Sequence, residues 1–148
     1  MATPRTIRRL AFQALYQLDA VQDPEPECIR ASIDIEPDLK KTDIDKALQL
    51  ARLAYEFRAE ADRAVAELAP EWPTHRQPAV DRALLRLAYF EMTRTSTPPK
   101  AAVAEAVKLA KEFSTEKSPS FMNAILDKLL KKVLASRPTG QPLGEAES

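Results

Sequence analysis

The stretch from Val80 to Lys128 decides the fold of this chain, because it contains three successive helical patterns. They read VDRALLRLAYFEMTR (residues 80–94), PPKAAVAEAVKLAKEF (98–113) and SPSFMNAILDK (118–128). The first pattern is apolar on most sides, which is typical of a helix surrounded by others. The other two carry proline where a helix starts and show one apolar face each. The stretch therefore predicts an all-α domain with a central helix over residues 80–93.

Helical periodicity continues on the N-terminal side of this stretch. Apolar residues at helical spacing predict a helix from about Thr6 to Ala20, a short one around Cys28–Ile33, and a long one to about Ala69. Thr42 and Asp43 can cap the long helix, as Ser118 can cap the last one. No segment alternates with a period of two, so no strand is expected.

Composition indicates one ordinary domain rather than a disordered chain. The chain has 148 residues, of which 45% are hydrophobic, enough for a core. The two glycines, Gly140 and Gly144, are both among the last nine residues, which disfavours tight hairpins and phosphate-binding loops. We expect a helical domain over residues 1–136 and a disordered tail over 137–148, where apolar side chains are almost absent.

Residue usage gives no support for an enzyme, a metal or a cofactor. Cys28 is the only cysteine, so neither a disulfide framework nor a thiolate metal cluster is expected. His75 is the only histidine, and no serine or cysteine nucleophile has a recognisable setting. A cytoplasmic location is the default expectation, with no membrane span and no apolar leader at the N-terminus.

The net charge is zero, but the positive charge is unevenly distributed. Residues 1–18 contain three arginines and no acid, whereas residues 19–71 contain seven bases and fourteen acids. Opposite the apolar face of the first predicted helix lies an N-terminal stripe of Arg5, Arg8, Arg9, Phe12 and Tyr16. Arginines bind phosphates, and exposed aromatic rings are platforms for unstacked bases. The alternative is that the rings pack on a neighbouring helix and the arginines only keep this end soluble.

A second, weaker candidate for RNA contact lies near the last predicted helix. There Lys117, Lys128, Lys131 and Lys132 flank Phe121 and Asn123. The alternative is an ordinary solvated lysine face.

The motifs quoted above resemble those of the NusB transcription antitermination factors. The resemblance lies in VDRALLRLA (80–88), PPKAAVAEAVKLAK (98–111) and SPSFMNAILDK (118–128). QALY (13–16) is similar to the family's first helix, and Trp72 with Arg76 to the run before the central motif. The resemblance thus extends from about Arg5 to Lys128, with the motifs in order.

This resemblance implies a fold and a function. The fold would be two packed helical subbundles of about six to seven helices. The function would be antitermination, chiefly of ribosomal RNA transcription, in which a small-subunit ribosomal protein called NusE and the NusB protein together bind boxA RNA. The complex then joins NusA, NusG and RNA polymerase. NusB proteins use their N-terminus for RNA, and Arg5, Arg8 and Tyr16 fall on matching positions.

The chain departs from the family pattern at several positions. The family opens with a denser basic run than Pro4-Arg5-Thr6, and Arg9 replaces a common glutamate. Ala104 replaces an asparagine. Ser114 and Ala124 replace glycines, which predicts a different helix end near Ser114 and closer-fitting neighbours near Ala124. Because the N-terminus has fewer basic residues than the family pattern, an alternative function is a NusB-like protein-interaction module with reduced RNA binding.

The resemblance also suggests a surface for the protein partner and an alternative function as part of an enzyme. We predict that Asp81, and more weakly Tyr89, contacts the protein partner, the alternative being packing at the edge of the core. An exposed helix face could equally serve a homodimer. NusB-like domains also occur fused to ribosomal RNA cytosine methyltransferases, but that enzyme needs strands and glycine-rich turns, for which the residues after Lys132 leave no room.

Overall fold

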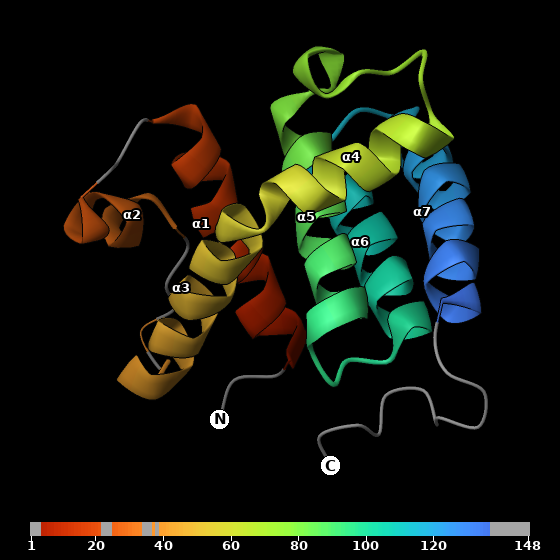
Figure 1. Cartoon of the computed structure of the whole chain (residues 1–148). Coiled ribbons are helices and arrows are strands. Elements are labelled where there is room, and N and C mark those ends of the chain that lie inside the picture. The colour runs from red at the N-terminus through yellow and green to blue at the C-terminus, as the bar shows by residue number, and fades with distance from the viewer. Residues whose placement is uncertain (1–3, 22–24, 34–36, 38, 137–148) are drawn as a thin grey trace. The chain divides into compact units, whose positions relative to one another are not determined.

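The computed structural model describes residues 4–21, 25–33, 37 and 39–136. These residues form seven α-helices and one short 3-10 helix and contain no strand (Figure 1). The prediction of an all-α fold of six to seven helices is therefore confirmed. The helices fall into two compact units, residues 1–57 and residues 58–148. The predicted tail over 137–148 lies outside the described residues.

The first unit is built on the pairing of its two long helices. It contains α1 (Pro4–Ala20), α2 (Pro26–Ser32) and α3 (Lys41–Glu56). Helix α1 packs along α3, and α2 packs on α1 (Figure 1). Buried alanines recur on α3 at Ala47, Ala51 and Ala54, a helical spacing of four and three. Because the side chains at a contact set the distance between two helix axes, these small residues allow a close approach.

The second unit surrounds one central helix. It contains α4 (Arg58–Leu68), η1 (Thr74–Arg76), α5 (Ala79–Arg94), α6 (Pro99–Phe113) and α7 (Ser118–Ala135). Helix α5 contacts α4, α6 and α7 (Figure 1), so the predicted central helix is confirmed. Its fully buried side chains include Leu84, Leu85, Leu87 and Met92. Burial of each such side chain stabilises the fold by about 2 kcal/mol.

The predicted long helix ending near Ala69 is wrong, because the structure divides it in two. Helix α3 ends at Glu56 and α4 begins at Arg58, and between them Phe57 has φ −94° and ψ 15°. No proline or glycine marks this position, so local sequence contains no signal for the break. The predicted cap is also wrong. Helix α3 starts at Lys41, with Lys40 in the capping position and no side-chain capping bond.

A buried ion pair joins α4 to α5. The guanidinium of Arg86 is buried, and its Nε and Nη2 donate to the two carboxylate oxygens of Asp62 at 2.9 and 2.8 Å. Two parallel hydrogen bonds of this kind fix the relative orientation of the guanidinium and the carboxylate as well as the distance between them. It explains how the central helix tolerates a charge on a face that packs against α4.

A second buried charge, Asp81, organises the connector between α6 and α7. Asp81 is only 2% exposed, and its Oδ1 accepts hydrogen bonds from the hydroxyls of Ser114 at 2.7 Å and Ser118 at 2.5 Å. Ser114 directly follows α6, and Ser118 is the first residue of α7. The predicted capping role of Ser118 is therefore wrong: Lys117 holds the capping position, and the Ser118 hydroxyl binds Asp81.

The two glycine replacements have different consequences. Ser114 has φ −117° and ψ −169°, an extended backbone that does not require glycine. Helix α6 thus ends here without a residue in the left-handed region, and the serine hydroxyl adds a bond to Asp81. Closer-fitting neighbours at Ala124 were wrongly predicted, because Ala124 is exposed.

We expect Asp62→Ala to destabilise the protein by roughly 3 kcal/mol. The substitution removes two charge-assisted hydrogen bonds from a buried guanidinium, and the lower end of the usual range applies because Asp62 keeps some exposure. Chemical denaturation followed by circular dichroism measures the loss. The matched control is Lys131→Ala, which breaks an exposed pair with Asp127 and should cost less than about 1 kcal/mol. Equal losses in both variants would contradict the assigned role of Arg86–Asp62.

We expect Asp81→Ala to loosen the start of α7 without unfolding the protein. Two hydroxyls lose a charged acceptor, which should cost about 2 kcal/mol. Amide hydrogen exchange should accelerate over residues 114–121 and remain unchanged in α1. Asp127→Ala, which removes an exposed carboxylate from the same helix, is the control. Unchanged exchange over residues 114–121 in the Asp81 variant would show that the serines do not depend on this carboxylate.

Candidate nucleic-acid interface

The N-terminal stripe places three positive charges on the first two turns of α1. Arg5 is exposed, and Arg8 and Arg9 are partly exposed. The first turn of α1 itself contains no acidic residue. A helix N-terminus also carries a partial positive charge of its own. The beginning of α1 therefore combines two features that can bind phosphate groups, arginine side chains and a helix N-terminus.

The two aromatic residues of the stripe differ in exposure. Tyr16 is partly exposed, so part of its ring can be reached from solvent. Phe12 is 3% exposed, and the expectation that its ring is open to solvent is wrong. A buried ring packs in the core and cannot stack on a base in this conformation, which matches the alternative considered for Phe12. The stripe accordingly presents Arg5, Arg8, Arg9 and Tyr16.

The second predicted group lies at the start of α7, in the other unit. Lys117 in the capping position is exposed, as are Phe121 and Asn123. Phe121 is 57% exposed, and among the described residues Val21 is the only other large apolar side chain classed as exposed. An aromatic ring that projects into solvent beside a lysine is suited to a nucleobase and its phosphate.

The structure adds Trp72 to this second group. Its ring centroid lies 5.5 Å from that of Phe121, with an angle of 39° between the ring planes. Trp72 belongs to the connector between α4 and η1 and is partly exposed. The periodicity of the chain could not reveal this contact, since 49 positions separate the residues. The only sequence signal is that the single tryptophan stands between Pro70 and Pro73.

The two residues predicted to contact a protein partner do not lie together. Asp81 is buried and its carboxylate is occupied by serine hydroxyls, so it acts inside the second unit. Tyr89 lies eight residues further along α5, about 12 Å at 1.5 Å per residue. It is partly exposed, and its hydroxyl donates to Oε1 of Glu60 at 3.3 Å.

A small polar cluster surrounds Tyr89. Glu60 also pairs with Arg94, whose Nη2 lies 2.7 Å from Oε2 of the carboxylate. Burial raises the pKa of the Tyr89 hydroxyl above its ordinary value, and the neighbouring Glu60 charge raises it further. Tyr89 therefore remains a neutral hydrogen-bond donor at neutral pH. The cluster exposes a carboxylate, a guanidinium and part of an aromatic ring, groups that suit a protein surface.

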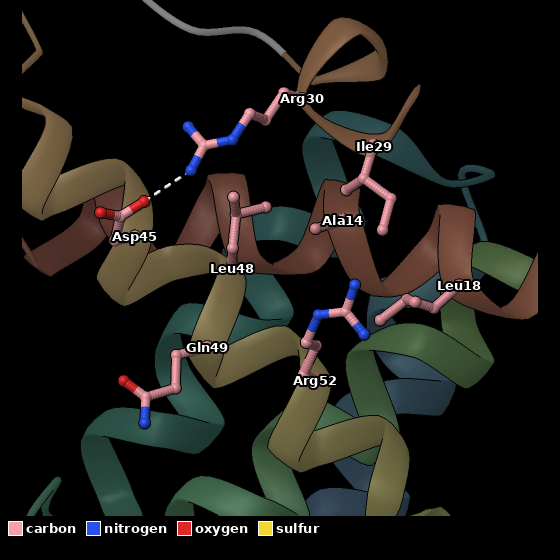
Figure 2. A pocket seen from close by; sticks show the side chains of 8 residues that line it. All are labelled: Ala14, Leu18, Ile29, Arg30, Asp45, Leu48, Gln49 and Arg52. Atoms are coloured by element: carbon pink, nitrogen blue, oxygen red, sulfur yellow. Dashed lines mark hydrogen bonds and ion pairs between the residues drawn. The ribbon is translucent and has the colours of Figure 1, made fainter. Parts of the chain in front are cut away.

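A pocket of about 290 Å³ lies within the first unit, between α1, α2 and α3. Figure 2 shows Arg30 of α2 reaching across its rim to Asp45 of α3, at 2.6 Å. Apolar side chains of the lining include Leu18, Ile29 and Leu48. None of the predicted RNA or partner residues lines this pocket.

Two further observations concern other kinds of site. In the described part of the chain, no three or more His, Cys, Asp or Glu side chains are placed to bind a metal ion. Cys28 and His75 are both exposed. None of the helices described is both long enough and apolar enough to cross a membrane.

Comparison with known proteins identifies the family. The model of the NusB family matches residues 5–131. A transcription antitermination protein NusB from Symbiobacterium thermophilum is 42% identical over 135 residues, which cover 86% of this chain and 88% of the relative.

Solved structures agree with this match. The structure of T. maritima NusB is similar with a TM-score of 0.76 at 31% identity, covering 89% of this chain and 94% of that one. A chain in the crystal structure of the antitermination factors NusB and NusE in complex with double-stranded RNA is similar in fold, with a TM-score of 0.73. It is 23% identical, and the match covers 86% of this chain and 96% of that one. With the family model matching most of its length, this chain belongs to the NusB family.

Proposed function

We propose that this protein is a transcription antitermination factor that binds boxA-type RNA of nascent ribosomal transcripts together with NusE. Its relatives carry the name of transcription antitermination protein, and a structural neighbour forms a complex with NusE and double-stranded RNA. The observation that carries the RNA part is the exposed Phe121 ring beside Lys117 at the start of α7. The proposed role is that of an adaptor with no catalytic step.

The N-terminal stripe and the group at the start of α7 would make different kinds of RNA contact. Arg5, Arg8 and Arg9 at the start of α1 supply charges for phosphates, a salt-dependent and sequence-independent contribution. The Phe121 ring supplies a stacking surface, which is worth roughly 1–3 kcal/mol per base. Tyr16 offers a second, smaller surface. Asn123 offers an amide that can bind the edge of a base.

The protein partner would use a different surface. We assign NusE to the cluster that Tyr89 and Arg94, in the C-terminal half of α5, form with Glu60 of α4, because aromatic and arginine side chains are enriched in protein interfaces. Asp81 is buried, and it would contribute only by holding the α6–α7 connector. A homodimer through the Tyr89 cluster is the competing arrangement. NusA, NusG and RNA polymerase would join the assembled complex in the cytoplasm, where nascent transcripts are made.

Two observations favour the second candidate function, a NusB-like interaction module with reduced RNA binding. Phe12 is buried, and the stripe contains three arginines where the family pattern has a denser basic run. Both facts reduce the surface that the N-terminus offers to RNA.

Titration of fluorescently labelled boxA RNA, with and without purified NusE, tests the proposed function. We expect a saturable complex that NusE strengthens. A tight complex with NusE but no RNA binding would support the interaction module instead. Binding to neither RNA nor NusE would overturn both functions.

We expect Arg8→Ala to weaken boxA binding by roughly fivefold, about 1 kcal/mol, and to flatten the salt dependence. Each phosphate contact to a single strand contributes about 0.7 to the slope of log affinity against log salt concentration. The matched control is Arg52→Ala, which removes one exposed arginine of the same unit outside the stripe. An unchanged affinity and slope in the Arg8 variant, or the same loss in the Arg52 variant, would remove Arg8 from the RNA site.

A further inference from the structure

The indole of Trp72 is the support on which the exposed Phe121 ring lies. The two rings are within packing distance, 5.5 Å between centroids, and are tilted by 39°. Tilted and offset arrangements are favourable for aromatic pairs because of their quadrupoles. The contact covers one part of the phenyl ring, yet Phe121 remains more than half exposed. One part of the ring is therefore held by protein while the rest stays open.

The connector that carries Trp72 is itself anchored. The Trp72 backbone N–H donates to the carbonyl of Ala69 at 3.0 Å, and the Trp72 carbonyl accepts from Nε2 of Gln77 at 3.2 Å. Gln77 is only 6% exposed. Nη1 of Arg82, on the first turn of α5, donates to the carbonyls of Thr74 and Gln77 at 3.0 and 3.2 Å. The position of the indole is thus tied to the central helix.

The helix that carries Phe121 is anchored to the same turn of α5. Asp81, the neighbour of Arg82, accepts the Ser118 hydroxyl, and Ser118 lies three residues before Phe121 on α7. Two adjacent residues of the central helix therefore hold both members of the ring pair, one through the connector and one through α7. This arrangement holds the two backbone segments that carry the rings to the same turn of α5.

We propose that Trp72 is a positioning residue for RNA, which holds the Phe121 ring in the orientation that stacks on an unpaired base. The inference rests on the proposed RNA-binding function. A freely rotating exposed phenylalanine must be immobilised when a base stacks on it, and that immobilisation lowers affinity. A ring already packed on Trp72 has lost this freedom before RNA arrives. Trp72 would therefore strengthen RNA binding by holding the Phe121 ring in place beforehand, and it makes no charged contact of its own.

Substitutions at both rings test this inference through the affinity for labelled boxA RNA and its salt dependence. Trp72→Ala should weaken binding by roughly fivefold with an unchanged salt slope, since no phosphate contact is lost. Trp72→Phe should remain within about twofold of the wild type because it retains an aromatic support. In a background of Phe121→Ala, the Trp72 substitution should have no further effect. His75→Ala, an exposed change in the adjacent helix η1, is the matched control and should bind as the wild type does.

The fluorescence of Trp72, the only tryptophan in the chain, provides a readout that does not depend on affinity. Phe121→Ala should shift its emission to longer wavelength in the absence of RNA, because the indole gains water. If Trp72→Ala lowers the melting temperature below the assay temperature, Trp72→Leu replaces it, since leucine keeps apolar volume without a ring.

Three results would overturn the positioning role. These are wild-type affinity in the Trp72→Ala or Trp72→Leu variant, losses that add in the double variant, and an altered salt slope. Failure of the wild-type protein to bind RNA would instead contradict the proposed function from which the inference starts.

Discussion

Asp81 is a carboxylate buried at the first turn of the central helix, and a buried charge must be hydrogen-bonded to be tolerated. The protein meets this requirement with two serine hydroxyls from opposite ends of the α6–α7 connector. The connector consequently cannot move independently of α5. Since α7 begins at Ser118, the same bonds determine where Lys117 and Phe121 are presented. The hydrogen bonds of the buried Asp81 carboxylate thus also position exposed residues at the start of α7.

The central helix carries a second buried charge, Arg86, which is satisfied in a different way. Its partner Asp62 lies on α4, so this pair holds a helix, whereas Asp81 holds a connector. Both charges reside on a helix whose other buried side chains are mostly apolar. Apolar packing supplies most of the stabilisation. The charged groups make the helix packing specific, because any other arrangement that left a buried charge unpaired would be costly.

The proposed RNA contacts combine two kinds of energy that respond differently to solution conditions. The arginines at the start of α1 act through charge, which salt screens. Phe121, supported by Trp72, acts through stacking, which depends on ring orientation and little on salt. The two groups belong to different units of the chain. Under this proposal, the ring pair would still bind a base in a protein whose N-terminus has few basic residues.

The sequence by itself determined the helices that have strong local signals. Apolar periodicity predicted α1 and α5 to within about two residues, and Pro99 and Pro119 marked the starts of α6 and α7. These features depend on neighbours three or four positions away, so they can be read from a single chain. The family motifs, which lie in the same helices, were recognisable for the same reason.

Only the tertiary structure decided which side chains reach solvent and which meet each other. No proline or glycine marks the helix break at Phe57. Phe12 is buried, although helical spacing places it beside the arginines. The Asp81–Ser118 bond and the contact of Trp72 with Phe121 join positions 37 and 49 residues apart. The physical reason is that burial and contact depend on the packing of several helices, whereas periodicity describes one helix at a time.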